Sequence, residues 1–260
     1  MVEIRIRSWD ELNQRLYQGS WKQPLARWRS DFAYRGMSDA SVNLGTTLLR
    51  LGSDPSRKEK HLLRNFRKYA SRQAAEQSIW DWLGLAQHHG LPTRLLDWTF
   101  SPLVALHFMT ADLEAYDRDG AVWMVDFKKV HALAPARLRE VLDAEEADVF
   151  TTDMLASVCN TMEKLDRLSD EVFAVFFEPP SLDERIVNQF ALFSMLSSPS
   201  HRLDTWLEAH PDLCVRLIVP AGLKWEVRDK LDQANITERV LFPGLDGLCA
   251  WLRRYYRPRH

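Results

Sequence analysis

The sequence predicts an α+β fold in which a central mixed or antiparallel sheet has helices packed around it. Apolar runs with the length of strands are concentrated in the second half of the chain, whereas segments with helical spacing come first and last. Strands and helices therefore do not alternate as they would in a doubly wound parallel sheet, and helices layered on one sheet are the simpler arrangement.

Length and composition are consistent with this fold. A chain of 260 residues suits one large domain or two small ones, and it can bury a core without a disulfide or a metal. The 46% of apolar and 27% of charged residues are typical of a globular protein. Since no internal repeat is evident, we expect one domain over residues 1–260. Its motif core would be 31–127, and the strands and helices at 172–256 would belong to the same unit.

The first elements are marked by capping and turn residues. Ser8 and Glu11 form a capping-box pattern that opens a short helix ending near Gly19. The aromatic run at 31–34 predicts a strand that leads into a turn at Gly36.

Three helices are expected around the middle of the chain. From Lys58 to Glu76, apolar residues recur at helical spacing with charges between them, which predicts an amphipathic helix. A second helix is predicted at 79–88, with Gly90 as its C-terminal stop. Ser101 can cap a third helix that extends to Tyr116, with a proline at its first position.

The second half supplies most of the predicted sheet. Apolar runs bounded by turn residues predict strands at 121–127, 172–177, 190–196 and 213–219. Two final helices are predicted at 227–234 and 245–256, on either side of a short strand at 240–242.

The segment from Gln87 to Thr99 carries the most information about function. It contains two histidines, an arginine, an aspartate and two threonines, and Gly90 and Pro92 make it a connection rather than a helix interior. Charged side chains on a short constrained loop are typical of a binding or catalytic site, although they can also form a buried structural cluster.

Together with the triplet Tyr34-Arg35-Gly36, this segment resembles the FRG domain, a family of mostly uncharacterised bacterial and phage-linked proteins. The second block of resemblance runs through 85–99 and continues over 101–108. Shorter matches begin at Pro179-Pro180, with Arg185-Ile186 and Gln189 leading into Phe190 to Phe193, and at Leu241, extending to Leu248. The blocks span most of the chain, so the whole protein resembles one FRG unit.

Two arginines in these blocks can bind anions. Arg35 precedes a glycine that can take positive φ and let a ligand approach closely, and its planar fork of donors matches a phosphate or carboxylate. The alternative is an arginine that pairs with an acidic neighbour. Arg94 lies three residues before Asp97 among apolar neighbours, so we expect an Arg94–Asp97 ion pair that holds the turn, with ligand contact as the alternative.

The histidines and the late glutamine are further candidates. Adjacent side chains on a helix point about 100° apart, so His88 and His89 would not bind one metal together, and no metal site is predicted. His88 can bond a ribose hydroxyl or a phosphate, or transfer a proton, although a packing role is the alternative. Gln189 opens a predicted strand and can bond a sugar hydroxyl. Glu178 and Glu184 lie nearby and are candidates to supply a negative charge, with ordinary surface glutamates as the alternative.

The order of these parts is similar to the sequence layout of ADP-ribosyltransferases, and this second resemblance implies a transferase-like fold with NAD as the cofactor. It implies that Arg35 holds the NAD phosphates, that Thr93 or Thr99 shapes the nicotinamide pocket, and that Gln189 contacts the ribose. The sequence departs from that layout because glutamine stands where the transferases carry an acid.

Two functions remain open on this basis. The first is a protein that binds a nucleotide or another phosphorylated ligand, with transfer of ADP-ribose to a macromolecule as the concrete activity of a toxin or phage-defence effector. The second is a non-catalytic binding or sensor module in which the motif loop is structural. The candidate catalytic residues are Arg35, His88 and Gln189. The candidate ligand-binding residues are Tyr34, Gly36, Gln87, Thr93, Arg94, Asp97, Thr99 and Arg185.

Charge and cysteine content set the expected partners and location. The net charge of -2 gives no overall field that favours nucleic acid or anionic membrane, and the basic run at 253–259 is expected to be a cationic helix end or a solvated tail rather than a nucleic-acid patch. The three cysteines lie far apart and are expected to be core residues in a reducing compartment. Without a leader or an apolar span, the protein is expected to be soluble and cytoplasmic.

Overall fold

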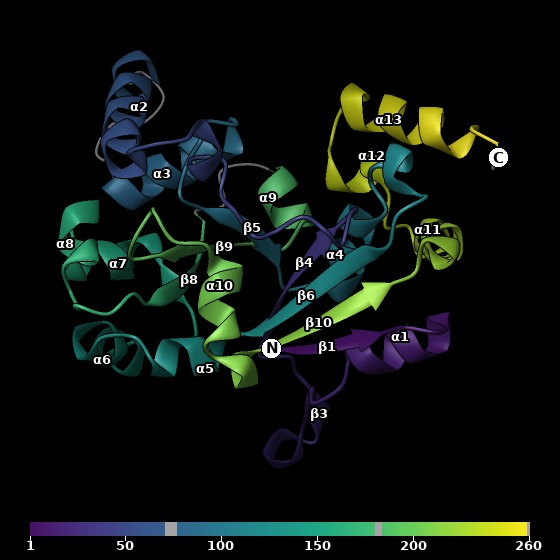
Figure 1. The fold of residues 1–260 in the computed structure, drawn as a ribbon, viewed down its shortest axis with the longest axis horizontal. Helices are drawn as coiled ribbons and strands as arrows, with labels where there is room; N and C mark the ends of the chain where they lie inside the picture. The colour runs from purple at the N-terminus through teal and green to yellow at the C-terminus, as the bar shows by residue number, and fades with distance from the viewer. Residues whose placement is uncertain (71–76, 180–183, 259–260) are drawn as a thin grey trace.

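One mixed sheet of eight strands organises the computed structural model, which describes residues 1–70, 77–179 and 184–258. The strand order is β1-β10-β6-β4-β5-β9-β8-β7, with helices packed around it (Figure 1). Only the edge pairs, β1 with β10 and β7 with β8, are parallel within this described sheet. The predicted α+β fold with a mixed central sheet is therefore confirmed. The strands in sheet order are β1 (Val2–Arg5), β10 (Cys214–Val219), β6 (Gly120–Asp126), β4 (Phe32–Met37), β5 (Leu96–Thr99), β9 (Ala191–Leu196), β8 (Ala174–Glu178) and β7 (Phe150–Thr151). A separate small hairpin is formed by β2 (Trp21–Lys22) and β3 (Arg27–Trp28).

The helices gather at the two ends of the sheet. Figure 1 shows α2, α3, α7 and α8 at the β8–β9 end, and α11, α12 and α13 at the other end. The helices are α1 (Trp9–Leu16), α2 (Pro55–Ala70), α3 (Ile79–His88), α4 (Pro102–Met109), α5 (Phe127–Ala132), α6 (Ala136–Ala144), α7 (Thr152–Val158), α8 (Met162–Asp166), α9 (Glu184–Asn188), α10 (Leu203–Glu208), α11 (Lys224–Gln233), α12 (Glu238–Leu241) and α13 (Leu245–Tyr255). Within the described ranges, no helix combines the length and apolarity needed to cross a bilayer.

The core divides into clusters on the two faces of the sheet. One cluster packs α2, α3, α6 and α7 on β8 and β9, with Trp80 fully buried at its centre. A second joins α1, α4 and α11 to β4, β6 and β10, and Tyr34 and Met109 belong to it. A third contains Trp98 and Phe176, whose ring centroids lie 5.4 Å apart. Burial of these apolar side chains is the main source of stability for the scaffold that carries the site.

Several predicted boundaries are confirmed because local chemistry sets them. Helix α3 covers residues 79–88, Ser78 caps its first turn, and Gly90 ends it at a φ of 78°. The Ser101 side chain accepts a bond from the Val104 amide at the start of α4, although that helix ends earlier than expected. Helix α2 begins at Pro55, while 71–76 of the helix expected there, and Pro180 of the third motif block, lie outside the described residues.

Other predictions were wrong where short runs carried little periodic signal. The strand expected at 240–242 is the helix α12, because three apolar residues are too few to distinguish the two periods. The strands β1 and β5 were not predicted, since each has only four residues. Cys249 is exposed on α13, in contrast to the buried Cys159 and Cys214, so the prediction that all three are core residues was also wrong.

Candidate functional site

A cleft of about 350 Å³ opens where β4 and β5 separate. These strands pair at one position, Tyr34 with Thr99, whereas β5 pairs with β9 along its whole length. The cleft brings together predicted candidates from distant parts of the chain. They are Tyr34, Arg35, Gly36, Gln87, His88, Asp97, Thr99, Arg185 and Gln189. Thr93 and Arg94 do not line it.

Arg35 lies on β4, opposite Trp123 of β6. Its Nη1 donates to the main-chain carbonyl of Asp97, and its Nε is buried with no hydrogen-bond partner among the described residues. Burial lowers the pKa of Arg35 from its ordinary value; the charge of Asp97 opposes this shift and that of Arg50 adds to it. Arg35 therefore retains an unused donor and a poorly solvated positive charge beside the cleft.

Asp97 supplies a carboxylate at the cleft, on the strand next to Arg35. Gln87 Nε2 donates to Asp97 Oδ2 at 2.9 Å, and the Gln87 carbonyl oxygen accepts from the Thr93 hydroxyl. These two hydrogen bonds fix which end of the Gln87 amide faces Asp97. Thr93, which is buried, thus acts through Gln87 rather than at the cleft itself. Glu178 and Glu184 do not line the cleft.

Gln189 is held where α9 passes into β9. Its Nε2 donates to the Leu241 carbonyl at 3.0 Å, and its main-chain oxygen accepts from the Thr99 hydroxyl at 2.7 Å. The next residue, Phe190, has a φ of 47° and is 61% exposed, a left-handed conformation that non-glycine residues rarely adopt. Such strain persists only where the surrounding structure imposes it and is often found at functional sites. The amide nitrogen of Gln189 is thus engaged by α12, and its Oε1 remains the acceptor for a ligand.

Arg185 and His88 complete the polar lining. The Arg185 guanidinium lies 5.0 Å from the centre of the Phe242 ring, which holds this second cation by a cation–π contact. His88 is the last residue of α3, and its ring is 5.2 Å from that of His89. In the part of the chain that the structure describes, no cluster of three or more His, Cys, Asp or Glu side chains could hold a metal ion.

Gly36 has a packing role that was not expected. An added Cβ would lie 1.8 Å from the Ala105 carbonyl oxygen of α4, and the φ of Gly36 is not positive. The glycine is therefore required because α4 packs directly against the backbone of β4. Gly36 also lines the cleft, so the expectation that it lets a ligand approach closely stays a prediction.

Arg94 is the centre of a buried ion-pair cluster, and the predicted Arg94–Asp97 pair was wrong. Its Nε and Nη2 donate to Glu59 of α2, and its Nη1 donates to Asp166 at the end of α8, at distances of 2.5 to 2.9 Å. Burial alone would lower the pKa of Arg94, but the two carboxylates outweigh it and raise that pKa. Arg94 lies at a bend before β5, whereas Asp97 lies on β5 and accepts a hydrogen bond from Gln87.

The sequence contained a signal for this cluster that was missed. Glu59 is four residues before Leu63 on α2, and both are buried. A carboxylate on the apolar stripe of an amphipathic helix is rarely buried without a cationic partner, so Glu59 could have been assigned to an arginine.

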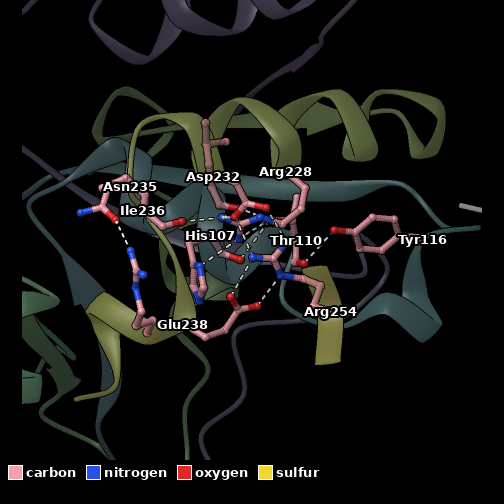
Figure 2. Close-up of polar contacts among 11 residues, drawn as sticks. His107, Thr110, Tyr116, Arg228, Asp232, Asn235, Ile236, Glu238 and Arg254 are labelled. Atoms are coloured by element: carbon pink, nitrogen blue, oxygen red, sulfur yellow. Dashed lines mark hydrogen bonds and ion pairs between the residues drawn. The ribbon is translucent and has the colours of Figure 1, made fainter. Parts of the chain in front are cut away.

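A second buried network, also not predicted, joins α4, α11, α12 and α13 (Figure 2). Arg254 of α13 donates to Asp232 at 2.7 Å and to Glu238 of α12 at 2.6 Å. Arg228, which is fully buried, contacts His107 Nδ1 at 2.9 Å and donates to Asp232 at 3.1 Å. Arg254 is thus a buried and paired residue within the cationic end of α13.

This network fixes α12, which in turn contacts the cleft residues. Burial, and then the positive charge of Arg228, lower the pKa of His107 to about 4, so His107 is neutral near pH 7 and can accept the bond from Arg228. Glu238 begins α12, and Leu241 near its end binds the Gln189 amide. The position of Gln189 therefore depends on charge pairs formed by the last helix of the chain.

Comparison with known proteins gives one match. The model of the FRG domain family matches residues 30–118, which include β4, α2, α3, β5 and α4. This region supplies Arg35, His88 and Asp97 to the cleft, whereas Arg185 and Gln189 lie beyond it. Neither the curated proteins nor the solved structures contain a match to the chain.

Proposed function

On the premise that the chain carries an FRG domain at residues 30–118, we propose that the cleft binds a nucleotide or another phosphorylated ligand. The observation that carries this proposal is the state of Arg35, a half-buried cation at an open cleft whose Nε has no hydrogen-bond partner among the described residues. A positive charge held partly out of water without a paired carboxylate is costly, and a phosphate bound in the cleft would neutralise it.

The rest of the lining is consistent with such a ligand. Arg185 adds a second positive charge, and Phe108 and Phe193 provide apolar surface for a base or a nicotinamide ring. Ligand sites typically occupy about 300–1,000 Å³ and combine apolar walls with a few polar groups. At about 350 Å³, the cleft suits a nucleoside phosphate or one half of a dinucleotide.

We further propose, as the concrete activity, transfer of ADP-ribose from NAD to a macromolecule. The bond between ribose C1′ and the nicotinamide nitrogen breaks, and nicotinamide leaves with the electron pair. An acceptor nucleophile forms the new bond to C1′ and loses its proton. In this assignment Arg35 holds the phosphates, Gln189 Oε1 accepts a bond from a ribose hydroxyl, and His88 takes the proton of the acceptor.

Asp97 would compensate for the glutamine at position 189. A ribose that loses nicotinamide develops positive charge, which an amide cannot stabilise as a carboxylate can. Asp97 is the carboxylate among the described lining residues, and Gln87 orients it. We therefore assign to Asp97 the electrostatic role that the ADP-ribosyltransferase layout gives to a glutamate.

The second candidate is a non-catalytic binding module. The observation that favours it is the engagement of Gln189 by the Leu241 carbonyl, which fixes the amide as a structural group. In that case the cleft would bind its ligand without changing it.

A ligand screen tests the binding proposal. NAD, ADP-ribose, ATP, GTP and the parent nucleosides are each added in a thermal-unfolding assay. A ligand at 100 times its Kd should add about 2.7 kcal/mol and raise Tm by several degrees. The shift should disappear in Arg35→Ala and persist in Arg7→Ala, an exposed control. If no phosphorylated compound raises Tm, or if Arg35→Ala responds like the wild type, the proposal fails.

An activity assay separates the two candidates. Nicotinamide release from NAD is measured with the wild type and with Asp97→Asn, using the exposed Asp10→Asn as control. Catalysis predicts a loss of about 100-fold or more in Asp97→Asn with ligand binding retained. Growth arrest on expression, relieved by the same variant, would support the effector role. If NAD binds to the wild type, Asp97→Asn and Asp10→Asn and none of them releases nicotinamide, the protein is a binding module.

A further inference from the structure

A second hollow lies apart from the cleft, between α2, the start of α3 and the start of α8. Its volume is about 820 Å³. It is lined by four cationic side chains of α2, all exposed, namely Lys60, Arg64, Arg67 and Lys68. The cleft lies at the other end of α3, which is about 15 Å long, so the two hollows have no lining residue in common.

The four cations form one continuous stripe. Their positions follow helical spacing of three to four residues, which places them on the same side of α2. Glu59 is the acidic residue of this helix, and it is buried and bound to Arg94. Lys60 pairs with Glu163 across the hollow at 2.8 Å. Within the described residues, Arg64 and Arg67 form no ion pair with a carboxylate, so the middle of the stripe keeps its positive charge although the chain as a whole carries -2.

The floor and rim of the hollow add groups that recognise more than charge. The exposed Arg67 guanidinium lies 5.7 Å from the centre of the buried Trp82 ring, which supports it from below, so its outer face is a planar surface on which a base can stack. The amides of Gln77 and the exposed Asn160 also line the hollow. Amide groups of this kind can bond the edges of bases.

We propose that this groove binds a single-stranded nucleic acid. A positive groove that follows the phosphates, combined with a stacking platform, is the general solution for single strands. A membrane surface does not fit, because the cations line a concavity that a bilayer cannot enter. The near-neutral net charge argues against nucleic acid only as an average over the chain, whereas binding depends on the local distribution of charge.

The test measures the anisotropy of fluorescein-labelled dT20 and U20 between 50 and 200 mM salt. Four phosphate contacts predict a slope of log K against log salt near about -2.8, at about 0.7 per contact. Arg64→Glu with Arg67→Glu should weaken binding at least about tenfold and reduce the slope to about -1.4. The matched control is Arg27→Glu with Arg29→Glu, two exposed arginines at the β3 hairpin, which Figure 1 places far from α2.

The control should bind like the wild type, and all proteins should unfold at similar temperatures. If the charge reversal disturbs folding, Arg64→Gln with Arg67→Gln tests the same contacts with uncharged polar side chains. The proposal is overturned if neither oligonucleotide binds at 50 mM salt, or if both charge-reversed proteins lose affinity equally. It is also overturned if polyglutamate of matched charge displaces the oligonucleotides as well as unlabelled dT20 does, because the groove would then select acidic polypeptides.

Discussion

Arg35 and Arg94 come from the two most distinctive motif blocks, yet their surroundings differ. Arg94 is buried and enclosed by Glu59 and Asp166, and the two carboxylates raise its pKa. Arg35 is half-buried and bonds a main-chain carbonyl, its Nε has no partner among the described residues, and burial lowers its pKa. A saturated arginine stabilises the fold, whereas an unsaturated one beside a cleft is available to a ligand.

The largest expected effect is the loss of Arg94. Arg94→Met should lower the free energy of unfolding by about 3–5 kcal/mol, because Glu59 would remain buried without its partner. Urea unfolding measures this change. The double variant Arg94→Met with Glu59→Met should recover much of the loss, since no buried charge then remains. If Arg94→Met is as stable as the wild type, Arg94 does not stabilise the fold in the way inferred here.

Gly36→Ala tests the scaffold directly beside Arg35. The new methyl group would meet the Ala105 carbonyl oxygen at 1.8 Å, and backbone atoms cannot move aside easily. We expect a loss of about 3 kcal/mol in unfolding free energy, at the upper end of overpacking effects. Gly222→Ala, where nothing lies within 4 Å of the added Cβ, is the control and should change stability little. Equal stability of the two variants would contradict the tight packing of α4 on β4.

Arg228 is another buried arginine, and its bond to His107 makes the free energy of unfolding depend on pH. His107 is neutral in the fold, with a pKa of about 4, and its ordinary pKa in the unfolded chain is about 6.5. As the pH falls, the unfolded chain therefore binds the proton before the folded chain does. The stabilisation that comes from neutral His107 is thus complete above pH 6.5 and is lost as the pH falls towards 4. Between pH 7 and 5 the loss should be roughly 2 kcal/mol. Urea unfolding at several pH values should show a shallower dependence for His107→Gln, and an unchanged slope would exclude His107 as its source.

The smallest effect on stability is expected for Arg35. Arg35→Ala should change the free energy of unfolding by less than about 1 kcal/mol, because the lost hydrogen bond is offset by removal of an unpaired buried charge. The same variant should lose all thermal stabilisation by phosphorylated ligands. A loss of stability like that of Arg94→Met would show that both arginines are structural, and the contrast between them would disappear.

Much of the cleft could be predicted because its residues lie in recognisable local patterns. Arg35 precedes Gly36, and Gln87 and His88 end a helix whose limits were predicted. Asp97 follows shortly after. The partners of these residues could not be predicted in the same way. Asp97 was assigned to Arg94 by proximity in the sequence, whereas in the structure Asp97 bonds Gln87 and Arg94 pairs with two acidic residues from distant helices.

The sequence by itself determined the local elements and the residue types of the candidate site, since capping, helical spacing and glycine conformation act over a few residues. Only the tertiary structure decided that Arg94 pairs with Glu59 and Asp166, which lie 35 and 72 positions away in the chain, and that a carbonyl of α12 binds Gln189. It also decided that Arg35 forms no ion pair with a carboxylate of the described residues. These outcomes depend on which buried faces pack together, and that choice is made by the whole core rather than by any short segment.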